Sequence, residues 1–320
     1  MRMFLKDFNE EVVVRFARLE FIRGEWRKYL GDLNLPGETF QTDPNLTTFN
    51  ISAVNIEENA ARAPVNYVLP PSILREVDPS QVQQRQMNEQ ALSFEVCNLK
   101  DGSARAAYKN VQFDVRTYKK LKMFVHAEEI TKSSPLKSND LTLFVRLGSD
   151  FTDNYYEYEM PLATTFWNET ALKGSPVSDP NEIWPDANNM EIDFDNLLLV
   201  KKKRNSVTEN PNSTTTNTSE YMMVDPANPT RYIKVKGSPN LQGIKTIMIG
   251  VRNPAIDNDK LWSDDGLAKC GNVWINELRL TDFQSNGGTA AVGRMQVQAA
   301  DFANVSVSGN YSTINWGSIE

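Results

Sequence analysis

The segment LTLFVRLGSDFTDNYYEYEMPL, residues 141–162, shows the pattern of two β-strands joined by a loop. Apolar residues alternate strictly over its first seven positions, and its second half places Tyr156, Tyr158 and Met160 on one face of an extended chain. A period of two residues is the signature of a half-buried β-strand. The loop GSDFTDN between the two halves has the glycine, aspartate and asparagine residues that connect strands. The segment therefore predicts a β-hairpin of residues 141–147 and 155–162.

The two faces of this hairpin differ in chemistry. The face with the alternating leucine and valine residues is expected to lie in a core, together with Tyr156, Tyr158 and Met160. The opposite face carries Tyr155, Glu157 and Glu159, which are expected to point outward or toward a partner domain.

Period-two alternation recurs along the chain. A strand is expected at the start of residues 49–62, and others at residues 92–96, 111–115, 121–125, 190–200, 232–235, 244–251 and 273–280. Helix signals are few, and the polar stretch 205–219 is expected to be a mobile loop. Eight or so strands joined by loops of uneven length predict an all-β fold, an antiparallel jelly-roll-like β-sandwich.

The last part of the chain shows a different alternation. In residues 288–313, small and apolar residues such as Met295 and Val297 alternate with polar ones such as Arg294, Gln296 and Gln298. Stretches of about nine such residues are typical of transmembrane β-strands. One more hairpin in water fits the same pattern, so both interpretations stay open at this point.

The overall composition allows a folded core and excludes one class of partner. Of the 320 residues, 40% are hydrophobic and 23% are charged, and the formal net charge is −7. A negative balance argues against nucleic acid, because binding to a phosphate backbone needs a basic surface. The first residues hold no apolar signal-peptide region, and no run of about 18 apolar residues predicts a transmembrane helix.

Two cysteines, Cys97 and Cys270, are the only thiols. Neither belongs to a CxxC pair, which argues against a zinc or thioredoxin-type site. One long-range disulfide and two free thiols are both compatible with the sequence.

Motifs that carry catalysis are not found. The single histidine, His126, lies in a strand-like run and is expected to be structural. Glu157 and Glu159 share one strand face, but so do many carboxylates that do no chemistry. The sequence has no nucleophile elbow, no HExxH helix and no phosphate-binding glycine loop, so we expect no enzymatic activity.

Two kinds of ligand site have candidate residues. Acidic loops containing Asp150 and Asp153, or Asp257 and Asp259, offer the oxygen ligands that calcium prefers. Ordinary solvated loops are the alternative, and no cofactor is expected.

Aromatic side chains offer the second kind of site. Tyr155, Trp167 and Trp184 could stack on a sugar ring, as in a carbohydrate-binding module of a cell-surface protein. For Tyr155 we favour packing across the strands.

Long phrases of the sequence resemble a known family. They are EENAARAPVNYVLPPSILRE (57–76), LFVRLGSDFTDNYYEYEMPL (143–162), IWPDANNMEIDFDNLLLVKKKRN (183–205), NVWINELRLTDF (272–283) and GRMQVQAADFANVSVSGNYST (293–313). In this order they resemble the SprA/Sov family, the outer-membrane translocon of the Bacteroidota type IX secretion system, which is linked to gliding motility. The side chains within these phrases that serve as fold signatures are Tyr156, Tyr158, Trp274, Asn276 and Glu277.

The resemblance implies a fold, a location and partners. Family members form a giant β-barrel that conducts folded cargo across the outer membrane of Gram-negative Bacteroidota to the cell surface. The chain would be an internal fragment of such a protein: residues 1–63 end a preceding structure, residues 64–285 form an inserted sandwich, and residues 286–320 begin barrel strands. The implied partners are the remainder of the barrel, a barrel shuttle, a periplasmic plug and secreted cargo, and the implied role is not enzymatic.

Overall fold

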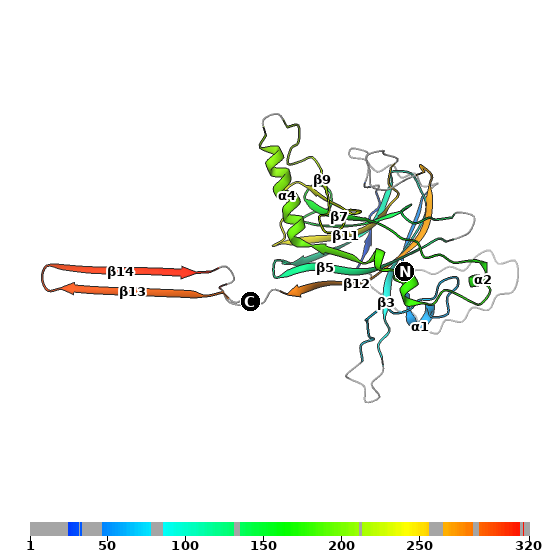
Figure 1. Cartoon of the computed structure of the whole chain (residues 1–320), viewed down its shortest axis with the longest axis horizontal. Coiled ribbons are helices and arrows are strands. Elements are labelled where there is room, and N and C mark those ends of the chain that lie inside the picture. The colour runs from blue at the N-terminus through cyan, green and yellow to red at the C-terminus, as the bar shows by residue number, and fades with distance from the viewer. Residues whose placement is uncertain are drawn as a thin grey trace, which may run out of the picture.

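Two antiparallel sheets face each other across one hydrophobic core (Figure 1). The computed structural model describes residues 25–31, 33, 47–77, 86–130, 135–210, 213–255, 265–283, 288–313 and 316. Within these residues most of the secondary structure is β-strand, which confirms the all-β sandwich. The jelly-roll subclass stays a prediction.

The larger sheet has seven strands in the order β1-β4-β11-β6-β7-β10-β9. Their bounds are β1 Arg27–Lys28, β4 Ala104–Phe113, β6 Thr142–Gly148, β7 Tyr155–Pro161, β9 Tyr221–Val224, β10 Tyr232–Lys236 and β11 Ile244–Arg252.

The smaller sheet has five strands in the order β2-β3-β12-β5-β8. Their bounds are β2 Thr48–Asn55, β3 Gln90–Leu99, β5 Tyr118–Glu128, β8 Met190–Asp193 and β12 Lys269–Phe283.

The predicted hairpin is confirmed. Strands β6 and β7 pair in register, with Val145 opposite Tyr158 and Leu147 opposite Tyr156. Tyr156, Tyr158 and Met160 are buried in the main core, as the alternation predicts. Burial of side chains of this size is the main source of stability for such a sandwich.

One predicted strand is partly wrong. Only Met190–Asp193 is a strand, and the helix α4 follows at once over Phe194–Thr208. Asp193 caps this helix by accepting a hydrogen bond from the backbone N–H of Asp195. The apolar run continues at helical spacing, so the buried residues of α4 are Phe194, Leu197, Val200 and Arg204.

The remaining helices are single turns in the connections. They are α1 Ile56–Asn59, α2 Glu169–Leu172, α3 Pro180–Ile183 and the 3-10 turn η1 Asp186–Asn188. Among the helices of the described residues, none is both long and apolar enough to cross a lipid bilayer.

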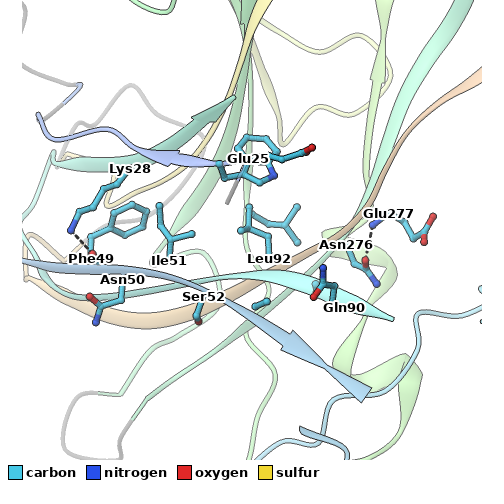
Figure 2. A pocket seen from close by; sticks show the side chains of 14 residues that line it. Glu25, Lys28, Phe49, Asn50, Ile51, Ser52, Gln90, Leu92, Asn276 and Glu277 are labelled. Carbon is cyan, nitrogen blue, oxygen red and sulfur yellow. Dashed lines mark hydrogen bonds between the residues drawn. The ribbon is translucent and has the colours of Figure 1, made fainter. Parts of the chain in front are cut away.

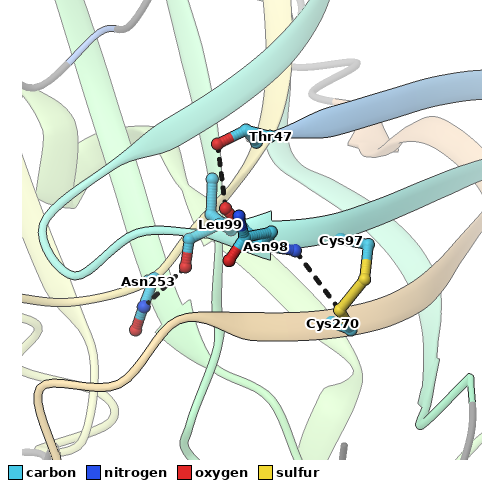
Figure 3. The surroundings of a disulfide bond; sticks show 6 residues. All are labelled: Thr47, Cys97, Asn98, Leu99, Asn253 and Cys270. Carbon is cyan, nitrogen blue, oxygen red and sulfur yellow. Dashed lines mark hydrogen bonds between the residues drawn. A yellow bond between two sulfur atoms is a disulfide. The ribbon is translucent and has the colours of Figure 1, made fainter. Parts of the chain in front are cut away.

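A disulfide resolves the question of the two cysteines. Cys97 at the end of β3 is bonded to Cys270 near the start of β12, and 173 residues separate them along the chain (Figure 3). The backbone N–H of Asn98 donates to the Sγ of Cys270 at 3.2 Å. The bond therefore fixes the two adjacent strands at one end of the smaller sheet.

The chain ends of the described region extend the sandwich in two ways. Strands β1 and β2 lie before residue 64 and are hydrogen-bonded into the two sheets. After β12, strands β13 Ala290–Ala299 and β14 Ala303–Ser312 form a separate two-stranded sheet that projects away from the sandwich (Figure 1). The division of the chain into domains after residues 63 and 285 stays a prediction.

Candidate functional site

The projecting hairpin β13–β14 has one apolar and one polar face. Ten residues of each strand pair in register, from Ala290 opposite Ser312 to Ala299 opposite Ala303. Alternate pairs share a face, so five consecutive alternate pairs form a continuous surface that is apolar throughout. These pairs are Ala291–Tyr311, Gly293–Gly309, Met295–Val307, Val297–Val305 and Ala299–Ala303.

The other face of the hairpin is polar apart from Ala290 and Val292. Its remaining side chains are Arg294, Gln296, Gln298, Asn304, Ser306, Ser308, Asn310 and Ser312. The side chains on both faces are largely exposed, Met295 to 59% and Val292 to 83%. Within the described part of the chain, no other segment covers the apolar face of this hairpin. An exposed apolar surface of this size commonly marks a site of interaction.

Aromatic side chains lie at both ends of this hairpin. Phe302 occupies the turn between the strands and is 93% exposed, and Tyr311 lies near the open end and is 64% exposed. Strands of nine to eleven residues with aromatic residues at each end have the dimensions of a transmembrane β-strand pair.

The outer face of the β6–β7 hairpin holds a buried network of charges. Glu157 lies opposite Arg146 on one side and Lys234 on the other, and it forms ion pairs with both. Arg252 from β11 adds a third cation at 3.0 Å from Glu157. The side chain of Glu157 is not accessible to solvent. Four strands therefore contribute to one network.

Glu159 belongs to the same network. Its Oε2 is 2.7 Å from the Nζ of Lys234, it forms an ion pair with Arg252, and its Oε1 accepts a hydrogen bond from the Oγ1 of Thr142 at 2.7 Å. Burial would raise the pKa of Glu159, but Arg252 and Lys234 outweigh this effect and lower the pKa to about 2. Burial also opposes ionisation of Glu157, yet Arg252, Lys234 and Arg146 hold its pKa well below the usual value.

The expectation that Tyr155, Glu157 and Glu159 point outward is wrong, because all three are buried, and the alternative that they face a partner domain stays a prediction. The ring of Tyr155 lies 4.2 Å from the guanidinium of Arg146, and its hydroxyl donates to Glu220 at 2.9 Å. A charged side chain is tolerated at a buried position when an oppositely charged partner is buried next to it. The sequence signal for this burial is the positive charge of Arg146, Lys234 and Arg252, which is opposite to that of the two glutamates. This signal becomes informative only when the pairing of the strands is known.

The loop between β6 and β7 is organised by Asp150. Its carboxylate accepts hydrogen bonds from the backbone N–H groups of Thr152, Asp153 and Asn154 and from the side-chain amide of Asn154. Partial burial opposes this charge, but these hydrogen bonds lower the pKa of Asp150 to about 2. Asp153 forms an ion pair with Lys236 instead.

The structure therefore shows the position of only two of the four predicted calcium ligands. Asp150 and Asp153 share one loop, and Asp257 and Asp259 lie outside the described residues. Within the described ranges, no three histidine, cysteine, aspartate or glutamate side chains gather in a way that could hold a metal ion.

Trp184 and Trp274 meet in a second, smaller core between β12 and the segment around α3. Their ring centroids are 6.2 Å apart, and His126 lies 4.1 Å from Trp274. The indole N–H of Trp184 donates to the carbonyl of Val68 at 2.9 Å. His126 is fully buried, and its Nδ1 lies 2.8 Å from the carbonyl of Ile183, a position that fits a structural role.

Trp167 lies in the same small core and donates its indole N–H to the carbonyl of Glu129 at 3.2 Å. A stacking platform for a sugar must be open to solvent, and Tyr155, Trp167 and Trp184 are each at most 3% exposed. The structure thus gives these rings packing roles: Trp167 and Trp184 share the smaller core, and Tyr155 packs on Arg146.

Asn276 and Glu277 mark a bulge in β12. The pairing of β12 with β5 shifts between Asn276 and Arg279, and Glu277 has a left-handed backbone with φ of 54°. The side chain of Asn276 stabilises the turn by accepting from the N–H of Glu277 and by donating to Glu89. The fold-signature residues therefore specify strand geometry.

Within the described residues, the protein is an antiparallel β-sandwich with an amphipathic hairpin whose apolar face is uncovered. The chain belongs to the SprA_N family, described as motility related/secretion protein, whose model matches residues 1–320. This match confirms the resemblance in the sequence. No curated protein matches the chain.

Proposed function

We propose that the chain is a segment of a large outer-membrane channel for protein secretion and gliding motility, and that it acts without enzymatic chemistry. The observation that carries the proposal is the β13–β14 hairpin, whose one face is apolar over five consecutive alternate pairs. Lipid would cover that face, and the polar face would border an aqueous interior, as in transmembrane β-barrels.

Two further observations support a place in the cell envelope. The family is described as motility related/secretion protein. The Cys97–Cys270 disulfide suits a compartment outside the cytosol, because disulfides persist where the environment is oxidising.

The remaining partners follow from the same proposal. An isolated strand pair leaves backbone groups unpaired at both edges, which lipid does not tolerate. The hairpin would therefore pair with strands from the remainder of the same large protein. A barrel shuttle, a periplasmic plug and secreted cargo are the partners that such a channel would serve.

The proposal is tested in the full-length protein in its own cells. Met295→Arg places a charge on the lipid-facing side and should cost roughly 2–4 kcal/mol of membrane stability. We expect less protein in the outer membrane and less cargo in the medium. The matched variant Gln296→Arg lies on the opposite face and should secrete normally. Normal secretion by both variants would contradict the proposal.

A further inference from the structure

The edges of the two sandwich sheets are not alike. Edge strands expose unpaired backbone groups, which proteins commonly protect by making the strand short or by placing charges or proline on it. Among the described residues, three of the four edge strands are short: β1 has two residues, and β8 and β9 have four each. The fourth, β2, has eight residues, TFNISAVN, with no charge and no proline.

Two hydrogen bonds show which residues of β2 present their backbone groups to the outside. The carbonyl of Phe49 accepts from the Nζ of Lys28, and the backbone N–H of Asn55 donates to the side chain of Asn59 at 2.9 Å. Neither bond goes to β3. Backbone groups alternate in direction along a strand, so the odd-numbered residues of β2 point away from β3.

Ile51 and Ala53 lie between these two bonded positions. Their N–H and C=O groups share the outward direction, and no hydrogen bond recorded among the described residues reaches them there. Ala53 is exposed and Ile51 is partly exposed. The middle of the β2 edge is therefore open, while both of its ends are already bonded.

A groove of about 1060 Å³ runs along this open edge (Figure 2). Its apolar lining includes Phe49 and Ile51 from β2 and Leu92 from β3, and Trp26 and Lys28 form the wall on the side of the other sheet. The volume of this groove is at about the upper limit of that of small-molecule pockets.

We propose that the β2 edge binds an extended strand of a partner polypeptide, with apolar side chains at alternate positions. Backbone hydrogen bonds to Ile51 and Ala53 would hold the strand, and its apolar side chains would enter the groove; this is β-strand addition. The groove separates β2 from Trp26, and an extended strand would occupy that space. The edge of a second folded copy brings an opposite wall of its own, which disfavours pairing between two copies. This interaction goes beyond the proposed role of the hairpin and does not depend on it.

Amide-resolved hydrogen exchange on the 320-residue chain tests the proposal. In the free chain, the amides of Ile51 and Ala53 should exchange much faster than those of Ser52 and Val54, which face β3. The probe is a capped eight-residue peptide that alternates valine and threonine between terminal lysines. At ten times its Kd, this peptide should slow exchange at Ile51 and Ala53 about tenfold. A control peptide with proline at one valine and at the adjacent threonine lacks a donor on each edge and should give no protection.

Two variants at one position separate pairing from folding. Ala53→Pro removes an outward N–H and leaves the bonds to β3 intact, so the fold should persist while binding is lost. Ala53→Val keeps the N–H and should bind as the wild type does, and thermal melting confirms that each variant is folded.

Four results would overturn the proposal. The first is slow exchange at Ile51 and Ala53 in the free chain, which would mean that the edge is already paired. The second is protection that grows with protein concentration alone, which would identify a second copy as the occupant. The third is equal protection by the proline-containing peptide, and the fourth is no protection by the probe at 1 mM, a concentration of the order of the weakest specific affinities.

Discussion

Glu157 and Glu159 keep their charges inside the protein because cations from neighbouring strands neutralise them. Removing one partner of a buried ion pair leaves an uncompensated charge, which commonly costs several kcal/mol. The same pairing explains why β7 is buried on both faces from Tyr155 to Met160 instead of having a solvated face.

Glu157→Gln should therefore destabilise the protein by about 3–5 kcal/mol, because Arg146, Lys234 and Arg252 lose their common partner. The matched control is Asp114→Asn, which removes the exposed ion pair with Arg116 and should stay within about 1 kcal/mol of the wild type. Urea unfolding measures both variants. Equal stability of the two would show that the network contributes nothing.

The lowered pKa of Glu159 predicts a pH dependence. The pKa in the folded protein is about 2 and that of an unfolded glutamate is about 4.3, so the unfolded chain binds the proton first as the pH falls. The stabilisation is complete above about pH 4.3 and is lost progressively toward pH 2. Melting curves from pH 6 to pH 2 should show a smaller loss of stability in Glu159→Gln than in the wild type. Parallel curves would contradict this origin of the acid sensitivity.

Single residues were predictable where only the local period mattered. Tyr156 and Tyr158 lie in the core because side chains of one strand face share one environment. The burial of Glu157 was not predictable, because it depends on Lys234, which is 77 residues away along the chain. Arg252 contributes to the network over a longer separation still, and the sequence does not state which strands are neighbours.

At the scale of elements, the hairpin β13–β14 and the helix α4 show the two outcomes of sequence interpretation. The hairpin was predictable because its alternation runs through all of β14 and through β13 from Gly293 onward. The helix was missed because Met190, Ile192 and Phe194 continue the alternation of the strand into the first residue of α4. The cap at Asp193 was the signal that separates them.

The exposed apolar face of the hairpin predicts self-association of the chain in water. A chain that ends at residue 285 should sediment as a monomer, whereas the 320-residue chain should form larger species. The reason is that copies can bury the continuous apolar surface of the hairpin against one another. In the longer chain, Met295→Arg should reduce association and Gln296→Arg should not. Monomeric behaviour of the unmodified 320-residue chain would count against an apolar face that needs covering.

The whole molecule combines a rigid body with a projecting strand pair. The two sheets share one core, the Cys97–Cys270 bond fixes β3 to β12, and β12 is the last sandwich strand before the hairpin. We propose that this strand pair lies in a membrane, with one face in lipid and the other in water.

Cysteine labelling of the full-length protein in its own membrane tests that claim most directly. Single substitutions Arg294→Cys, Met295→Cys, Gln296→Cys, Val297→Cys and Gln298→Cys are treated with a water-soluble maleimide. Because neighbouring residues of a strand face opposite sides, we predict labelling at 294, 296 and 298 and none at 295 and 297. Equal labelling at all five positions would contradict the account.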